Sequence, residues 1–329
     1  MSWDHPLPSE QPSELPFPSL QPSPPPEKTK VVLPAILLLC TFATSMTAGF
    51  VWHVRFVSQG QNELAERIVG VLTNPMDLLN GLPFAFTILL ILLAHEMGHY
   101  LACRFYGIRV TLPYVIPGPP PLNPFGTFGA VIKIKSVFAD RRQLFDVGVA
   151  GPLAGFIFIV PALIIGLHQS TELVFTEPIR QSLDFGEPLM FQLAAPLFFP
   201  GDPDATIRLH PIGWAAWFGM LATSINLLPI GQLDGGHMVF ALFGTRSHRI
   251  ISYTVFGALV GIGLYSWPMI GLLLFALILL FMGFRHPRPR TEFSPLGKGR
   301  KIIALIGLII FVLTFIPVPV RIIEHLGRL

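Results

Sequence analysis

The feature that most constrains this chain is a series of apolar runs, each long enough to cross a membrane. A helix needs about 17–25 apolar residues to cross the ~30 Å hydrocarbon core of a bilayer. Seven such runs occur, near residues 31–52, 82–103, 146–167, 212–229, 250–266, 268–284 and 302–320. Only 12% of the 329 residues are charged, whereas charged residues make up roughly 25% of an average soluble domain. The sequence therefore predicts an all-α polytopic membrane protein with about seven transmembrane helices, and it excludes a soluble globule.

The charges of the connecting loops agree with this layout. Loop 104–145 carries six basic residues and one acidic residue, a net charge of +5, and loop 285–301 has the same balance. Loop 168–211 carries two basic and six acidic residues, a net charge of −4. Because Lys and Arg accumulate in cytoplasmic loops, seven spans with a cytoplasmic N-terminus place both basic loops on the expected side. The basic residues lie beside apolar runs, so we expect a lipid bilayer and no nucleic acid as a partner.

Residues 1–30 contain nine prolines. Proline lacks the backbone donor that helices and sheets need, so this segment is predicted to be a disordered, Pro-rich cytoplasmic tail. It lacks the basic, apolar and small-residue order of a signal peptide. Its Pro, Ser and acidic residues are also untypical of a transit peptide. On these grounds the sequence favours a bacterial inner membrane over a plastid.

The apolar run 82–103 contains the sequence HEMGH, with His95, Glu96 and His99 as its ionisable residues. Two histidines four residues apart lie on one face of a helix, so both imidazoles can reach one ion. Zinc with an open coordination position lowers the pKa of water to ~7, and a neighbouring carboxylate such as Glu96 can take the proton. Ionisable groups at membrane depth are costly and usually functional. We therefore predict that His95 and His99 bind a metal ion.

Two histidines and a water leave zinc one protein ligand short, and Asp234 is the predicted third ligand. It lies in the sequence NLLPIGQLDGGH, which starts at Asn226 and ends at His237. The run from residue 212 is expected to stop near Leu228, because Pro229 removes a backbone donor. Asp234 then lies at the cytoplasmic end of its span, on the same side as the two histidines. The alternative role for this aspartate is a helix cap.

His237 offers a possible fourth ligand, one helical turn after Asp234. A fourth protein ligand would close a zinc site to water. A substrate contact or a hydrogen bond to a ligand is therefore the favoured role for His237.

The segment 107–135 follows the HEMGH helix and includes the alternating sequence GAVIKIK at 129–135. Alternation of this kind predicts a strand or hairpin. A strand beside the metal site would pair with an unwound substrate by β-augmentation. The alternative is a cytoplasmic loop held at the membrane interface by its lysines.

HEMGH in a membrane span, followed by NLLPIGQLDG, resembles the site-2 protease (M50) family of intramembrane zinc metalloproteases. GTFGAVIKIKS at 126–136 and VAGPLAGF at 149–156 resemble the branch of chloroplast ethylene-dependent gravitropism-deficient proteins and their bacterial homologues. The resemblance implies one Zn²⁺ per chain, bound by the histidines and the aspartate of the two motifs. It also implies that Glu96 is the general base and that Asn226 polarises the scissile carbonyl.

The resemblance implies a protease that hydrolyses peptide bonds in or near transmembrane segments of membrane-protein substrates, as in regulated intramembrane proteolysis. The expected domains are the tail (1–30), a first transmembrane helix with an outer loop (31–81), the catalytic core (82–245) and the C-terminal transmembrane helices (246–329). One alternative is a non-proteolytic metal-binding membrane protein, a transporter or scaffold derived from this fold. Another is a zinc hydrolase that acts on a small or lipidic substrate. Transport needs no carboxylate beside the metal, so Glu96 favours the enzyme.

Overall fold

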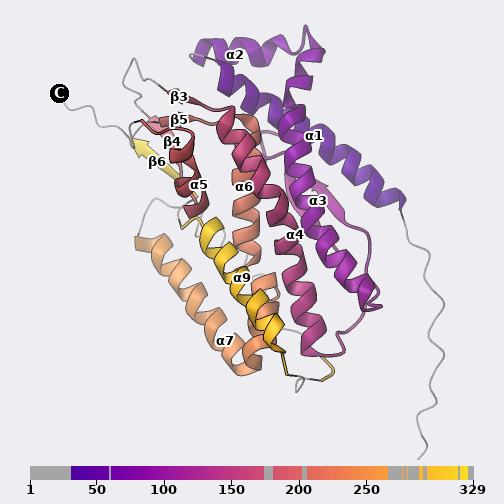
Figure 1. The fold of residues 1–329 in the computed structure, drawn as a ribbon. Helices are drawn as coiled ribbons and strands as arrows, with labels where there is room; N and C mark the ends of the chain where they lie inside the picture. The colour runs from indigo at the N-terminus through magenta and orange to yellow at the C-terminus, as the bar shows by residue number, and fades with distance from the viewer. Residues whose placement is uncertain are drawn as a thin grey trace, which may run out of the picture.

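The computed structural model is mostly helical, with three small two-stranded sheets (Figure 1). It describes residues 31–58, 61–173, 181–201, 206–265, 276, 280, 289–291, 295–317 and 319–324. The predicted tail 1–30 and nearly all of the predicted span 268–284 lie outside the described residues.

The helices follow most of the predicted apolar runs. The longer ones are α1 (Val32–Val57), α3 (Leu82–Phe105), α4 (Arg141–His168), α6 (Pro211–Asn226), α7 (Asp234–Tyr265) and α9 (Lys298–Thr314). The shorter helical segments are α2 (Gln61–Gly70), η1 (Pro75–Gly81), α5 (Leu189–Ala194) and η2 (Ala195–Leu197). Helix α4 lies at the centre of the bundle and packs against α3, α6, α7 and α9.

Four described helical segments are long and apolar enough to cross a membrane, and a seven-span arrangement is not shown. They are α1, η1 together with α3, α4 and α7. Helices α6 and α9 have 16 and 17 residues, fewer than the ~20 of a typical spanning helix. The prediction extended both runs further, to residues 229 and 320.

The helix ends explain part of this difference. Helix α6 stops at Asn226, three residues before Pro229, and the chain continues as a loop up to Asp234. Helix α7 then contains a non-helical residue, Gly244, with φ 81° and ψ 179°. The predicted span 250–266 is therefore the second part of α7, and the first part begins at the predicted third ligand.

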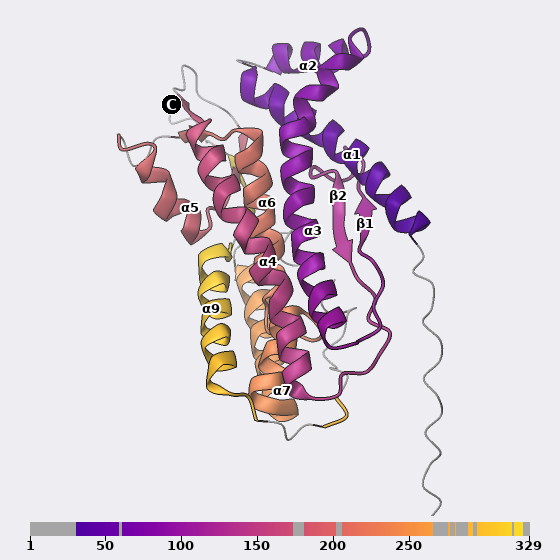
Figure 2. The same cartoon turned by 45° about the vertical axis from the view of Figure 1, so that its right-hand side comes forward.

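The predicted hairpin is present beside the bundle. Strands β1 (Tyr114–Pro117) and β2 (Thr127–Val131) pair antiparallel, and they lie alongside α1 and α3 (Figure 2). An isolated bridge between Val110 and Ile134 continues the pairing. The strand begins two residues before the predicted alternation at 129–135, and the fold prediction of a small β element near the metal-binding helix is confirmed.

Two further sheets join segments that are distant in sequence. Strand β3 (Thr171–Leu173) pairs with β5 (Thr206–Arg208), and β4 (Gln181–Phe185) pairs with β6 (Val320–Glu324). After α9 ends at Thr314, the chain becomes extended and reaches β4 as strand β6.

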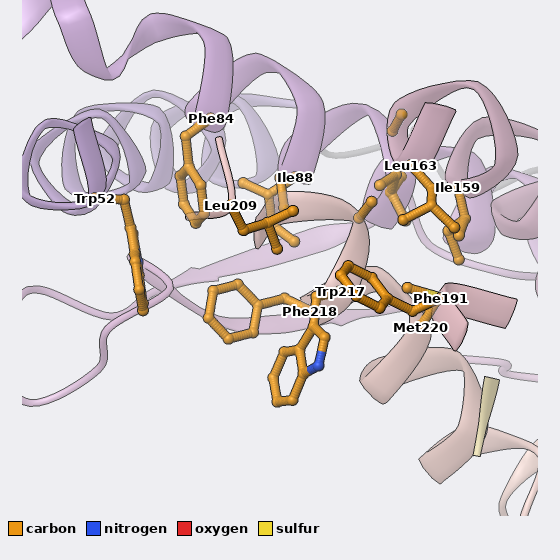
Figure 3. Packing of buried hydrophobic residues seen from close by; sticks show 14 of the residues in the cluster. Trp52, Phe84, Ile88, Ile159, Leu163, Phe191, Leu209, Trp217, Phe218 and Met220 are labelled. Carbon is orange, nitrogen blue, oxygen red and sulfur yellow. The ribbon is translucent and has the colours of Figure 1, made fainter. Parts of the chain in front are cut away.

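The apolar core has one large cluster and a second one further along α3. The first cluster gathers aromatic and aliphatic side chains from α1, α3, α4 and α6, including Trp52, Phe84, Ile159 and Phe218 (Figure 3). The second cluster includes Cys103 near the end of α3. His95 and His99 therefore lie on α3 between two buried apolar regions.

Candidate metal centre

The three predicted ligands come together. The Nε2 atoms of His95 and His99 lie 3.1 Å apart. The Oδ2 atom of Asp234 lies 3.2 Å from His95 Nε2 and 3.3 Å from His99 Nε2. Both histidines are buried, and the Asp234 side chain is 13% exposed. Residues 95 and 234 are 139 positions apart in sequence, so only the tertiary fold can bring them together.

This triangle of atoms fits zinc. Zinc bonded to nitrogen and oxygen at ~2.0–2.1 Å with tetrahedral angles separates its ligand atoms by about 3.3 Å. The three distances of 3.1, 3.2 and 3.3 Å match that separation. Two imidazoles and a carboxylate are also the donor set that catalytic zinc sites use, with the fourth position left for water or substrate. Among the described residues, His237 is not part of this group.

Helix α3 places the two imidazoles, because residues i and i+4 of a helix lie one above the other. Helix α4 then fixes the His99 ring, whose Nδ1–H donates to the Val147 carbonyl at 2.7 Å. That bond leaves the Nε2 lone pair for a metal, as outer partners of metal-binding histidines usually do. A Cβ at Gly151 would lie 2.1 Å from His99 Nε2. Only glycine therefore lets α4 approach this ring.

Glu96 is buried beside the ligand triangle and does not belong to it. Ile132, the residue just after β2, lies close enough for its backbone N–H to interact with this carboxylate. The hairpin therefore approaches the predicted general base. The side-chain Nδ2 of Asn226 lies 3.3 Å from His95 Nε2, so the last residue of α6 reaches the same centre.

Sequence reasoning found the ligand triangle and missed the groups that hold it. The Val147 carbonyl that binds His99 is a backbone group, so no side-chain pattern reveals it. Gly151 lies in VAGPLAGF at 149–156, which the sequence offered only as part of the family resemblance. In the structure this glycine leaves room for the His99 ring.

Comparison with known proteins agrees with this geometry. The family model for Peptidase family M50 matches residues 83–267, which include both motifs and more than half of the chain. The chain belongs to Peptidase family M50. The predicted resemblance to site-2 proteases is confirmed.

The chain is also similar to curated plant proteins. The chain is 32% identical over 321 residues to "Probable zinc metalloprotease EGY1, chloroplastic" of Arabidopsis thaliana, covering 90% of this chain and 55% of that protein. It is 31% identical over 253 residues to the protein of the same name from Oryza sativa subsp. japonica, covering 75% of this chain and 42% of the relative. It is 33% identical over 205 residues to "Probable zinc metalloprotease EGY2, chloroplastic" of Arabidopsis thaliana, covering 61% of this chain and 35% of the relative.

The chain thus spans about half the length of the curated relatives it matches. Their names place these relatives in chloroplasts. The expected bacterial inner membrane and cytoplasmic N-terminus therefore have no support from these relatives.

Proposed function

We propose that this chain is an intramembrane zinc metalloprotease that hydrolyses peptide bonds in or near transmembrane segments of membrane proteins. The observation that carries the proposal is the convergence of His95, His99 and Asp234 on one point at a spacing that suits zinc. Membership of Peptidase family M50 and relatives named zinc metalloproteases support the same activity. Zinc, when bound, supplies a Lewis acid and lowers the pKa of water to about 7.

In this proposal Glu96 is the general base. It adjoins a ligand in sequence, and the backbone N–H of Ile132 interacts with its carboxylate. Glu96 takes the proton from the attacking water and later gives it to the leaving amine, as general acid–base catalysis requires. The Asn226 amide, close to His95, donates to the carbonyl oxygen of the scissile peptide as negative charge develops there.

The proposed substrate is a transmembrane polypeptide, and β2 is its proposed partner. A helical peptide bond is shielded by its own hydrogen bond, so cleavage needs local unwinding. Among the described strands, β2 pairs only with β1. An unwound substrate segment would add to the other edge of β2. The interaction of the Ile132 N–H with Glu96 brings the end of β2 close to the reacting groups.

We propose that α6 and α9 also cross the membrane. Together with the four candidate segments and the predicted span 268–284, they give seven transmembrane segments. In this proposal α6 begins the crossing of the membrane, and the buried loop 227–233 continues it. The proposed domains are the catalytic core 82–245 between a first helix and a C-terminal helical region 246–329. In this proposal the N-terminus lies on the same side of the membrane as the two basic loops and the metal. Accessibility labelling of single cysteines in loops 104–145 and 168–211 would test this orientation.

Cleavage of a helical membrane polypeptide by the purified chain, with and without a chelator, tests the activity. Wild-type protein should cleave, lose activity with chelator and regain it with Zn²⁺. Glu96→Gln should still bind zinc while cleavage falls by about 10²–10⁴-fold. Full cleavage by a zinc-loaded Glu96→Gln variant would contradict the role of Glu96 as general base. Zinc binding by the wild-type protein without any hydrolysis would favour a non-proteolytic metal-binding protein. Hydrolysis of lipids with no polypeptide cleavage would instead favour a zinc hydrolase of lipidic substrates.

A further inference from the structure

The loop 227–233 carries the chain from Asn226 into Asp234, and most of it is buried. Its buried side chains are Leu227, Leu228, Ile230 and Leu233. A backbone that leaves the helix inside a membrane must satisfy its polar groups elsewhere in the protein. The hydrogen bonds of this loop therefore show what fixes the third metal-binding residue in place.

Part of the loop satisfies itself. The N–H of Ile230 donates to the Leu228 carbonyl at 2.8 Å, and the N–H of Leu233 donates to the Ile230 carbonyl at 3.1 Å. The Leu233 carbonyl accepts from the N–H of His237 at 2.9 Å. These bonds are local, so they shape the turn without attaching it to the rest of the bundle.

Two side chains from α7 bind the intervening carbonyls. Nε2 of His248 lies 3.0 Å from the Gly231 carbonyl, and the Ser252 hydroxyl donates to the Pro229 carbonyl at 3.1 Å. Because a carbonyl only accepts, His248 carries its proton on Nε2. The two residues are four positions apart, so they share one face of the helix.

The kink at Gly244 makes these contacts possible. It separates the first part of α7, which begins at Asp234, from the part that contains His248 and Ser252, and the second part lies apart from the first (Figure 1). His248 and Ser252 are 2% and 0% exposed. Leu259 of the same part packs with the apolar side chains of the loop. Polar residues buried in a membrane-spanning helix are costly, so this pair is expected to have a specific role.

We infer that His248 and Ser252 are positioning residues for the metal centre, holding loop 227–233 so that the Asp234 carboxylate meets His95 and His99. The inference rests on the proposed zinc site, and it adds residues that lie outside both motifs. Gly231 is three residues from Asp234, so a shift of its carbonyl moves the carboxylate. Groups around metal ligands typically contribute about 10–100-fold to metal affinity.

The test measures zinc affinity of the full chain in detergent, by competition with a coloured chelator. His248→Leu keeps the bulk and removes the donor, and it should weaken zinc binding about 10–100-fold. His248→Gln retains an N–H donor and should recover most of that loss. Ser252→Ala removes a single neutral hydrogen bond and should weaken binding about fivefold. The visible spectrum of the Co²⁺-loaded protein should change in His248→Leu, because the carboxylate ligand is displaced.

Ser170→Ala is the matched control. Its buried hydroxyl also binds a backbone carbonyl, that of Gly166 at 2.7 Å, but at the end of α4 remote in sequence from the metal-binding loop. It should leave zinc affinity unchanged. Equal weakening by Ser170→Ala and Ser252→Ala, or wild-type affinity in His248→Leu, would overturn the inference. If His248→Leu does not fold, His248→Gln and Ser252→Ala decide by the same measurement.

Zinc affinity and the cobalt spectrum do not depend on turnover. A wild-type chain that binds zinc tightly and cleaves nothing would refute the proposed protease while leaving this inference intact. A wild-type chain that binds no zinc would refute both the metal centre and the positioning role.

Discussion

Gly151 of α4 lies so close to the His99 ring that a Cβ at this position would come within 2.1 Å of Nε2. The carbonyl of Val147, one turn earlier on α4, accepts from Nδ1 of the same ring. Helix α4 therefore fixes this imidazole in two ways, by a backbone hydrogen bond and by the absence of a side chain. The orientation of a metal-binding ring is thus set by a neighbouring helix that contributes no side-chain donor to it.

Gly151→Ala is expected to displace the His99 ring and weaken zinc binding by at least about tenfold. Gly155→Ala should have a smaller effect, because its Cβ would lie 3.4 Å from the nearest atom of the His95 ring, Nδ1. Gly257→Ala, where no atom lies within 4 Å, is the neutral control. Chelator competition measures all three affinities. Wild-type zinc affinity in Gly151→Ala would show that the His99 ring tolerates a Cβ at residue 151, contrary to the inference from the structure.

Asn226→Ala is expected to lower kcat by about 10²–10³-fold, because a donor aimed at the developing oxyanion is lost. Zinc content should stay at the wild-type level, since the amide lies 3.3 Å from His95 Nε2 without belonging to the ligand triangle. Ser224→Ala, a buried neighbour whose hydroxyl bonds within α6, should change neither quantity. A rise in KM with unchanged kcat would assign Asn226 to substrate binding instead.

The unwinding requirement predicts how substrates respond to glycine. Replacing one leucine by glycine near the scissile bond should raise kcat/KM about fivefold, because glycine destabilises a helix by ~1 kcal/mol. The same replacement at the far end of the substrate helix should have little effect. Equal acceleration by both replacements would indicate that access to the membrane, and not local unwinding, limits the rate.

An ion pair attaches α9 to the catalytic helices. Nε and Nη2 of Arg300 donate to the two carboxylate oxygens of Asp146, at 2.8 and 2.6 Å, and the Tyr106 hydroxyl donates to the same carboxylate. Burial, and then the hydrogen bond to Asp146, raise the pKa of Tyr106. Its hydroxyl therefore keeps its proton near neutral pH and acts as a donor.

Arg300→Met is expected to lower the free energy of unfolding by about 1–3 kcal/mol, since charged hydrogen bonds on a partly buried carboxylate are lost. Arg67→Met breaks the exposed pair with Glu63 at 2.8 Å, and it should cost only about 0.3–0.5 kcal/mol. Thermal unfolding in detergent compares the two variants. A loss no larger than that of Arg67→Met would mean that this bidentate pair does not stabilise the packing of α9.

Local patterns predicted the local structure well. The four-residue spacing of His95 and His99 determined that both rings share one face, because helical periodicity depends only on neighbouring residues. The alternation at 129–135 indicated the hairpin, and β2 was found at Thr127–Val131. The predicted run 302–320 extends six residues past the end of α9 at Thr314, because Pro317 cannot continue the helix and the chain beyond it forms β6, which pairs with β4.

The sequence by itself determined the membrane-protein class, the helix that carries HEMGH and the three residue types that zinc needs. It also indicated that Asp234 lies at a depth similar to that of the histidines. Only the tertiary structure decided that the three donor atoms lie 3.1–3.3 Å apart, and which groups hold them there. Those groups are Gly151 and the Val147 carbonyl, with His248 added by inference, and each acts through space on a residue distant in the chain or through a backbone atom. Sequence spacing carries no record of either kind of contact, so their roles appear only when the helices pack.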